Sequence, residues 1–154
     1  MRKIKLLLLT VLLTSVLSMG VNAQENQIKV KDFRVGHTFI RSMAESTEDD
    51  PLAYISDFIT DSGSYLSISS KTASTMTCDS LKLEINVQEK KNGSWKTVKT
   101  FTYTEYNTSL ISKIPCYHGV NIGSEYRLKT YHYATVDGTN YMDINTSSSI
   151  TAKE

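Results

Sequence analysis

Apolar and polar residues alternate along the second half of the chain with a period of two. Residues 81–88 alternate strictly, and residues 126–134 repeat the pattern. This period places apolar side chains on one face of a β-strand and polar ones on the other. We therefore predict antiparallel strands with one face toward a core. In the later segment the predicted inward residues are Tyr126, Leu128, Thr130, His132 and Ala134, and the outward ones are Arg127, Lys129, Tyr131 and Tyr133.

Turn residues separate these segments from further predicted strands. Asn92-Gly93 and Asp137-Gly138 readily adopt the positive φ angles of two-residue hairpin turns. Between Trp95 and Val98 the apolar positions shift phase, which predicts a β-bulge or an edge strand. Trp95 itself is expected to pack in the core or between sheets, with a sugar-stacking platform as the alternative. The remaining predicted strands cover residues 65–73, 95–103, 110–117 and 141–150.

Short strands without a helical period between them predict an all-β fold. We expect an antiparallel β-sandwich of roughly six to eight strands, similar to immunoglobulin or fibronectin III domains, over residues 63–154. Residues 24–62 alternate weakly and include an acidic stretch ending at Pro51. They are expected to form a partly ordered or flexible extension, with one docking strand or short helix around residues 52–59.

The amino terminus has the features of an export signal. Three cations precede an apolar run, and Val21-Asn22-Ala23 matches the small-residue pattern of a cleavage site. The apolar run is shorter than a membrane-spanning helix of ~20 residues. We predict that residues 1–23 are a signal peptide and that the protein is secreted, either released or held non-covalently at the cell surface, with no transmembrane segment after cleavage.

Charge argues against two classes of partner. Cleavage removes three cations and no acid, so the net charge of +1 becomes −2. Nucleic acid and anionic membranes attract proteins with a basic excess, which this chain lacks. We therefore expect neither as a partner.

Two cysteines, Cys78 and Cys116, lie in the exported part. In an oxidising compartment an even pair is expected to form a disulfide, which would stabilise the fold by about 4 kcal/mol for a loop of this size. The alternative is a reactive or metal-binding thiol at Cys116 with the nearby His118. One cysteine and one histidine, without further ligands, cannot complete a zinc site.

No catalytic, metal or cofactor motif is present in the sequence. Zinc-hydrolase, serine-hydrolase, nucleotide-binding and dithiol signatures are all missing, so we assign no catalytic residue, no metal ligand and no cofactor. His132 shares the predicted inward face with tyrosines. It is expected to be a packed histidine with satisfied hydrogen bonds, and the alternative is a catalytic base.

Three short segments carry a resemblance to a known group of proteins. They resemble signatures of small secreted Gram-positive bacterial proteins that are grouped as a domain of unknown function. The segments are Gly93-Ser94-Trp95-Lys96-Thr97-Val98, the stretch from Gly123 through Tyr126-Arg127-Leu128-Lys129 to His132, and Ser147-Ser148-Ser149-Ile150. The resemblance covers about residues 60–154. It implies export, a spacing of strands along the chain similar to that of immunoglobulin or fibronectin III domains, and a tyrosine corner at Tyr126. It implies no reaction and no ligand.

Two hypotheses of function follow. The first is a non-enzymatic extracellular module that binds a protein or a cell-wall glycan through the polar sheet face or the loops. Its candidate contact residues are Tyr131, Tyr133, Arg127, Lys129, Tyr117 and His118. The second is a small secreted hydrolase or an enzyme inhibitor, with His118, His132 and a neighbouring carboxylate as the acid-base group.

Overall fold

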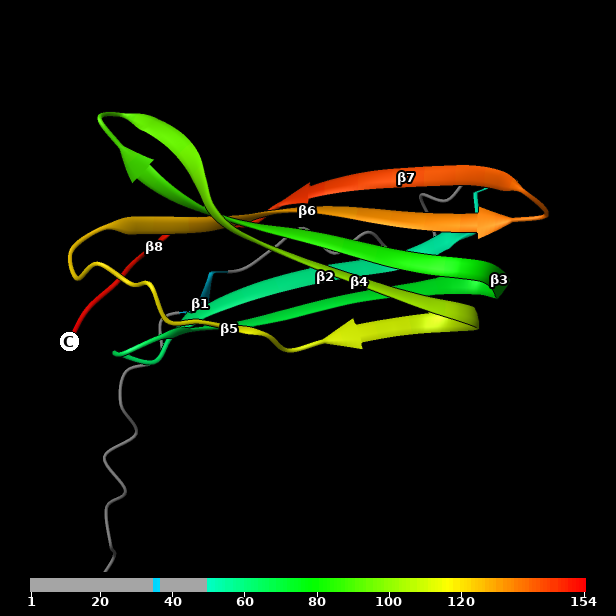
Figure 1. The fold of residues 1–154 in the computed structure, drawn as a ribbon, viewed down its shortest axis with the longest axis horizontal. Coiled ribbons are helices and arrows are strands. Elements are labelled where there is room, and N and C mark those ends of the chain that lie inside the picture. Colours follow the sequence, from blue (N-terminus) through cyan, green and yellow to red (C-terminus); the bar gives the residue numbers. More distant parts are fainter. Residues whose placement is uncertain (1–34, 37–49) are drawn as a thin grey trace, which may run out of the picture. The chain divides into compact units, whose positions relative to one another are not determined.

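The protein folds into antiparallel strands. The structure is a computed structural model that describes residues 35–36 and 50–154, and those residues contain no helix. Residues 1–23, the predicted signal peptide, and most of the predicted extension lie outside the described residues. The strands are β1 (Val35–Gly36), β2 (Leu52–Asp61), β3 (Leu66–Lys91), β4 (Ser94–Lys113), β5 (Cys116–Tyr117), β6 (Glu125–Val136), β7 (Thr139–Thr146) and β8 (Ile150–Thr151) (Figure 1).

All eight strands belong to one folded sheet. The main strand order is β1-β2-β3-β6-β7, while β4 and β5 pair with β3 and β8 pairs with β6. Every pairing is antiparallel. These findings confirm the predicted all-β antiparallel fold.

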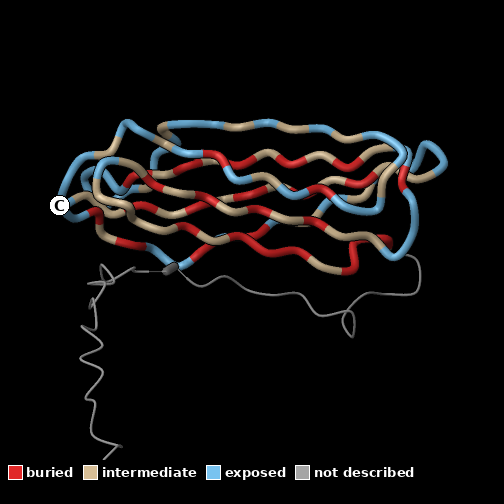
Figure 2. The backbone as a smooth tube through the Cα atoms, turned by 90° about the horizontal axis from the view of Figure 1, so that it is seen from below, coloured by how far each residue is buried: buried red, intermediate tan, exposed pale blue. Residues whose placement is uncertain are grey.

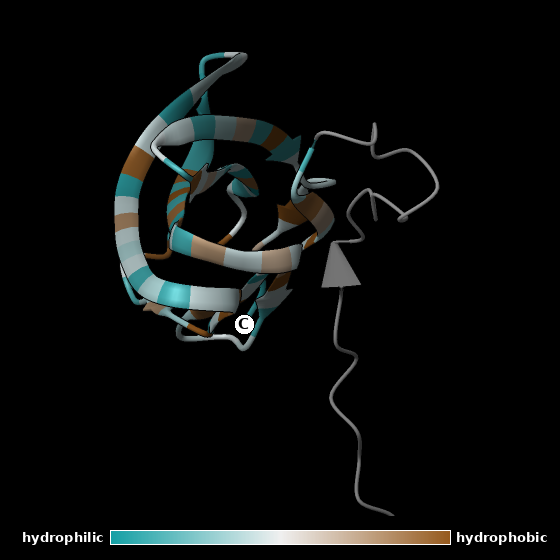
Figure 3. Ribbon diagram, turned by 90° about the vertical axis from the view of Figure 1, so that its right-hand side faces the viewer, coloured by the Kyte–Doolittle hydropathy of each residue, from teal (hydrophilic) through white to brown (hydrophobic). Residues whose placement is uncertain are grey.

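Strand β3 connects two layers of this sheet. It is 26 residues long and unites two segments that the sequence predicted as separate strands. Its first part pairs with β2 and its second part with β6. The pairing with β4 shifts register between Ala73 and Cys78, between the two parts. Viewed along its length, the sheet curls around an interior (Figure 3).

The core lies between the two layers. Leu66 and Ile68 from the first part of β3 share it with Leu83, Ile85 and other residues from the second part. Full burial of an aliphatic side chain of this size contributes about 1.5–3 kcal/mol. Buried and less buried positions alternate along the strands of this region (Figure 2). In β6 the alternation follows the prediction at each position from Tyr126 to Ala134.

The two predicted hairpin turns are confirmed. Asn92 and Gly93 have φ angles of 51° and 78°, and Asp137 and Gly138 have 48° and 74°. Positive φ at both central positions is the signature of a type I′ turn. The bulge is also confirmed, because the partner of Val87 is Lys99 whereas that of Gln88 is Thr97. Val98 is the extra residue.

The sheet begins earlier in the chain than expected. Strand β2 pairs with β3 from Leu52 to Asp61, so of the strand or short helix expected around residues 52–59 the strand is confirmed, and it is part of the sheet. Three consecutive residues of β2, Ile55, Ser56 and Asp57, are buried. A strand buried on both faces lacks the alternation that marks a half-exposed strand. The predicted strand at residues 110–117 is instead two elements, because β4 ends at Lys113 and β5 begins at Cys116.

Candidate functional site

The outward face of β6 continues onto β7. Tyr131 pairs with Ile144, and Tyr133 pairs with Met142. Side chains of directly paired residues lie side by side on one face of an antiparallel sheet. Met142 is 55% exposed and Ile144 is 45% exposed, while both tyrosines are partly buried. We call these four residues the outer patch.

Cations flank the tyrosines of the outer patch. The two rings are stacked, with centroids 6.4 Å apart and an interplanar angle of 14°. Lys82 Nζ lies 4.8 Å from the ring centroid of Tyr133, and Lys129 Nζ lies 5.4 Å from that of Tyr131. Desolvation by burial, followed by the negative charge of Glu84, raises the pKa of Tyr133. Its hydroxyl therefore stays protonated to a higher pH than that of an ordinary tyrosine and can donate a hydrogen bond.

A second aromatic contact lies at the end of the same face. The guanidinium carbon of Arg127 lies 4.4 Å from the ring centroid of Trp95, and Arg127 Nε donates a 2.8 Å hydrogen bond to Gln88. The contact holds the guanidinium plane in place beside the ring. Trp95 is only partly buried and does not belong to the core cluster. The expectation that it packs in the core or between sheets is wrong.

The other two candidate contact residues lie elsewhere. Tyr117 packs against the core, and its ring centroid lies 6.2 Å from that of the inward-facing Tyr126. His118 is exposed and contacts Tyr65, with ring centroids 5.4 Å apart. The structure thus gathers Arg127, Lys129, Tyr131 and Tyr133 on one strand face and separates them from Tyr117 and His118.

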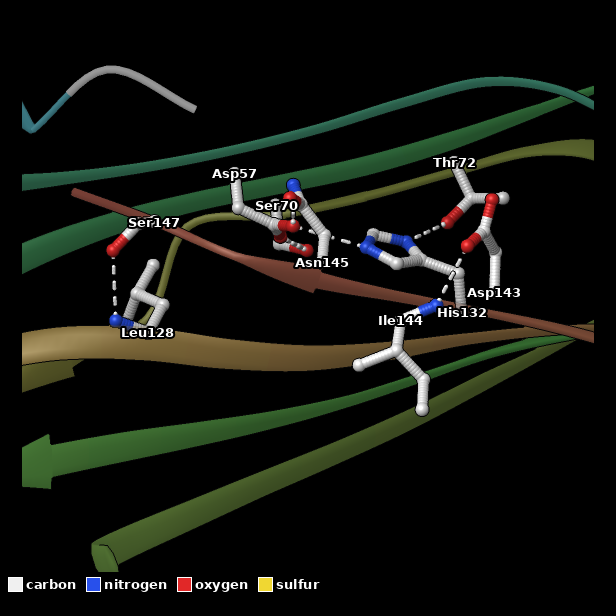
Figure 4. A network of polar contacts seen from close by, with 9 residues as sticks. All are labelled: Asp57, Ser70, Thr72, Leu128, His132, Asp143, Ile144, Asn145 and Ser147. Atoms are coloured by element: carbon white, nitrogen blue, oxygen red, sulfur yellow. Dashed lines mark hydrogen bonds and ion pairs between the residues drawn. The ribbon is translucent and has the colours of Figure 1, made fainter. Parts of the chain in front are cut away.

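A polar network fills part of the interior between the layers (Figure 4). Asp57 of β2 lies at its centre. One carboxylate oxygen accepts a 2.5 Å hydrogen bond from Ser70, and the other accepts bonds from Asn145 at 2.8 Å and from His132 Nε2 at 3.0 Å. The second ring nitrogen of His132 lies 2.7 Å from Thr72 Oγ1.

This network connects four strands by side-chain contacts. Asp57 comes from β2, Ser70 and Thr72 from β3, His132 from β6 and Asn145 from β7. All five residues are buried. Buried polar groups are costly unless they are hydrogen-bonded, and here both ring nitrogens and both carboxylate oxygens have partners. The expectation of a packed, satisfied His132 is confirmed.

The predicted acid-base group is not assembled. His132 has no exposed surface, whereas His118 is exposed and lies beside Tyr65. Thr72, the partner of His132, is seven residues from Tyr65, which directly precedes β3, and seven residues of extended chain span roughly 23 Å. The two histidines therefore cannot share a carboxylate.

Glu89 forms a second buried polar contact at the other end of β6. Its carboxylate lies 2.9 Å from Lys91 Nζ and accepts a 3.0 Å hydrogen bond from the Asn121 side chain. Burial alone would raise the pKa of Glu89, but hydrogen bonds from Lys91, Asn121 and Ser124 outweigh it and lower the pKa to about 2. Nearby, the Asn121 backbone N–H donates a 2.9 Å hydrogen bond to the Tyr126 hydroxyl. A tyrosine corner makes this type of contact.

The predicted disulfide is contradicted. Cys78 and Cys116 are both free thiols, the first buried and the second exposed. Cys116 pairs with Ser67 in β3, while Cys78 Sγ lies 3.2 Å from Ser74 Oγ. Seven residues of extended strand separate Ser67 from Ser74, roughly 23 Å, and a disulfide requires Cα atoms within about 7 Å.

The described part of the chain gives no sign of a metal centre or a membrane helix. Within it, no three His, Cys, Asp or Glu side chains gather where they could hold a metal ion. Among the same residues, no helix has the length and apolar character that crossing a bilayer requires.

Sequence reasoning missed half of the outer patch. The sequence predicts a strand that contains Met142 and Ile144, but its pattern does not assign either residue to a face of the sheet. The two-residue turn at Asp137-Gly138 could have located them, because it makes Val136 the partner of Thr139 and so fixes every later pair. Asp57 carried no comparable signal, since 75 residues separate it from His132.

No protein-family model matches the chain, and no curated protein matches it. We therefore infer function from the geometry of the chain itself.

Proposed function

We propose that the chain is an exported, non-enzymatic binding module that contacts a protein partner through the outer patch. The supporting observation is that Met142 and Ile144 are both about half exposed and lie directly beside Tyr131 and Tyr133. Contiguous exposed apolar side chains mark interaction surfaces. Tyrosine and methionine are also enriched where proteins contact one another.

The composition of the outer patch favours a protein over a glycan. A sugar-binding platform needs an open aromatic face, whereas Lys82 and Lys129 lie over the tyrosine rings. Aliphatic side chains such as Ile144 add apolar area that suits another protein's side chains. Glycan binding remains one outcome of the test below.

Charge indicates the kind of protein surface that fits. No described carboxylate pairs with Arg127 or Lys129, which lie along the same strand face. Fixed cations beside an apolar centre favour a partner whose own apolar centre is flanked by carboxylates. An enzyme inhibitor would be one form of such a module.

Export is the part of the proposal that rests on sequence alone. The signal at residues 1–23 predicts that the protein recovered from the culture medium begins at Gln24. Amino-terminal sequencing of that protein tests this prediction. A cell-retained chain beginning at Met1 would contradict export.

The contact surface is tested by photo-crosslinking in secreting cells. A photoreactive phenylalanine analogue replaces Tyr133 in one chain and Ser112, an exposed residue of β4, in the control. We expect one protein to crosslink through position 133 and not through position 112. With that protein purified, Tyr131→Ser combined with Tyr133→Ser should lower affinity about tenfold or more.

Three results would contradict the proposed contact. They are equal crosslinking at both positions, no adduct at position 133, or unchanged affinity of the folded double variant. An adduct that proves to be a glycan would overturn the protein assignment while keeping the surface.

A further inference from the structure

Strand β4 has an open edge. In the described part of the chain β4 pairs only with β3, so residues 99–105 have no strand on their other side. Natural proteins usually block such an edge with proline, bulges or charges, because its unpaired N–H and C=O groups can bind another strand. Within residues 99–105 there is no proline, and the only charges are at the two ends.

The segment Lys99-Thr100-Phe101-Thr102-Tyr103-Thr104-Glu105 is complementary to itself when reversed. A cation and an anion occupy its ends, two aromatic residues lie inside them, and threonines occupy the alternate positions. We propose that two copies of this chain pair through β4, antiparallel and with Thr102 at the two-fold axis.

This register gives a favourable partner to each side chain. Lys99 lies opposite Glu105 of the second copy, and Phe101 lies opposite Tyr103 of the second copy. Each of these pairs occurs twice, as does the pair of Thr100 with Thr104. Opposite charges and aromatic pairs placed directly across an antiparallel ladder are stabilising. Moving the axis by one residue, to Phe101 or to Tyr103, loses both ion pairs.

The backbone limits the pairing to the same segment. Val98 is the bulged residue of β4, and Asn107 has a φ angle of 51°. The regular stretch between these two irregularities is centred within one residue of Thr102. Bulges and residues with positive φ interrupt a ladder, so pairing is confined to the region where the side chains are complementary.

Existing contacts are compatible with the proposed dimer. Phe101 and Tyr103 are partly buried against the core, and a second copy would cover more of each. Glu105 already pairs with Lys113 at 2.6 Å through one oxygen. Lys99, whose Nζ lies 5.3 Å from the ring centroid of Phe101, has no described carboxylate partner.

The dimer would be symmetric and concentration-dependent. A two-fold axis normal to the sheet keeps both outer faces on the same side and joins the two sheets into one. Contact along a single strand edge is smaller than the interface of a permanent dimer. We therefore expect the dimer to dissociate on dilution and to form as the protein concentration rises.

Charge reversal tests the ion pairs. In sedimentation equilibrium of the full mature chain, we expect Lys99→Glu and Glu105→Lys each to weaken the homodimer about tenfold or more, because like charges then oppose each other twice. Mixing the two variants restores both pairs and should restore dimers. Lys129→Glu, the same charge change on the outer face of β6, should leave dimerisation unchanged.

Cysteine crosslinking tests the register. With Cys78→Ala and Cys116→Ser as background, Thr102→Cys should form a disulfide-linked dimer on mild oxidation, since position 102 meets itself. Thr100→Cys should not, because the two copies of position 100 are four residues apart, roughly 13 Å. Circular dichroism confirms that each variant is folded.

The outcomes are decisive in both directions. A monomer at every attainable concentration would overturn the proposal and leave the edge to a strand of a different protein. A dimer that crosslinks equally well through positions 100 and 102, or that mixing fails to restore, would overturn the register. Dimerisation that follows the charge pattern, with crosslinking through position 102 alone, would support it.

Discussion

Neighbouring residues of β6 occupy opposite environments. His132 faces inward, has no exposed surface and contacts Asp57 and Thr72. Tyr131 and Tyr133 face outward and border the exposed Met142 and Ile144. The buried Asp57–His132 network resembles catalytic chemistry, but it is enclosed, and both ring nitrogens and both carboxylate oxygens have hydrogen-bond partners. The outward side is the exposed one, and we propose that a partner binds there.

Removal of the Asp57 carboxylate should have the largest effect on stability. Asp57→Ala leaves donors on Ser70, His132 and Asn145 without their acceptor inside the protein. Unsatisfied buried groups cost about 1–3 kcal/mol each, so we expect the free energy of unfolding to fall by about 3–5 kcal/mol. Urea denaturation measures the change.

A matched control distinguishes the two sides of the sheet. Glu84→Ala removes a carboxylate from the outward face of β3 and should change stability by at most about 0.5 kcal/mol. Equal losses for Asp57→Ala and Glu84→Ala would show that the buried network has no special structural role.

Glu89 should account for part of the acid sensitivity. Its pKa falls from 4.5 to about 2 on folding, so its stabilising contribution is complete above about pH 4.5 and disappears as the pH falls toward 2. We expect Glu89→Gln to destabilise the protein by about 1–3 kcal/mol at pH 7.

The pH dependence gives the more specific test. Urea denaturation at pH values from 7 to 2 should show a smaller loss of stability in Glu89→Gln than in the unaltered chain. Parallel curves for the two proteins would contradict the lowered pKa.

The turn that sets the register of the outer patch should be moderately sensitive. Gly138 has a φ angle of 74°, and a Cβ added there would meet no atom within 4 Å. Gly138→Ala should therefore cost about 1–2 kcal/mol through backbone strain alone. Gly138→Asn should cost less, since asparagine tolerates this conformation. Equal thermal stability of the two variants would refute this account of the turn.

Substitutions in the outer patch should affect stability less than those in the buried network or at Glu89. Tyr131→Ser combined with Tyr133→Ser removes partly buried rings from a sheet surface and should lower the free energy of unfolding by about 1 kcal/mol. Thermal denaturation measures it. A loss as large as that of Asp57→Ala would indicate that the tyrosines serve stability and not binding.

The sequence contained enough information for the local structure but not for the contacts between layers. The alternation in β6 and the turns at Asn92-Gly93 and Asp137-Gly138 depend on nearby residues, and the structure confirms them. Strand β3 passes between its two pairing regions at residues 74–77, where its register with β4 shifts. These residues include neither glycine nor proline, so the sequence contains no local signal of the change in pairing.

Distant contacts explain the remaining differences. Asp57 was indistinguishable from a surface acid because its burial depends on partners on three other strands. The disulfide was inferred from the expected compartment, and that argument contains no distance information. The positions of Met142 and Ile144 could have been predicted in part. The hairpin turn fixes the register of β6 with β7, and counting residue pairs from that turn places Met142 and Ile144 beside Tyr133 and Tyr131.

We propose that the outward side of β6 serves binding and that its inward side serves stability. The most direct test measures the affinity of the crosslinked partner for Tyr133→Ser and for His132→Gln, at a temperature where both variants are folded. We predict a loss of about tenfold or more for Tyr133→Ser and less than about twofold for His132→Gln. The reverse order of effects would contradict the account.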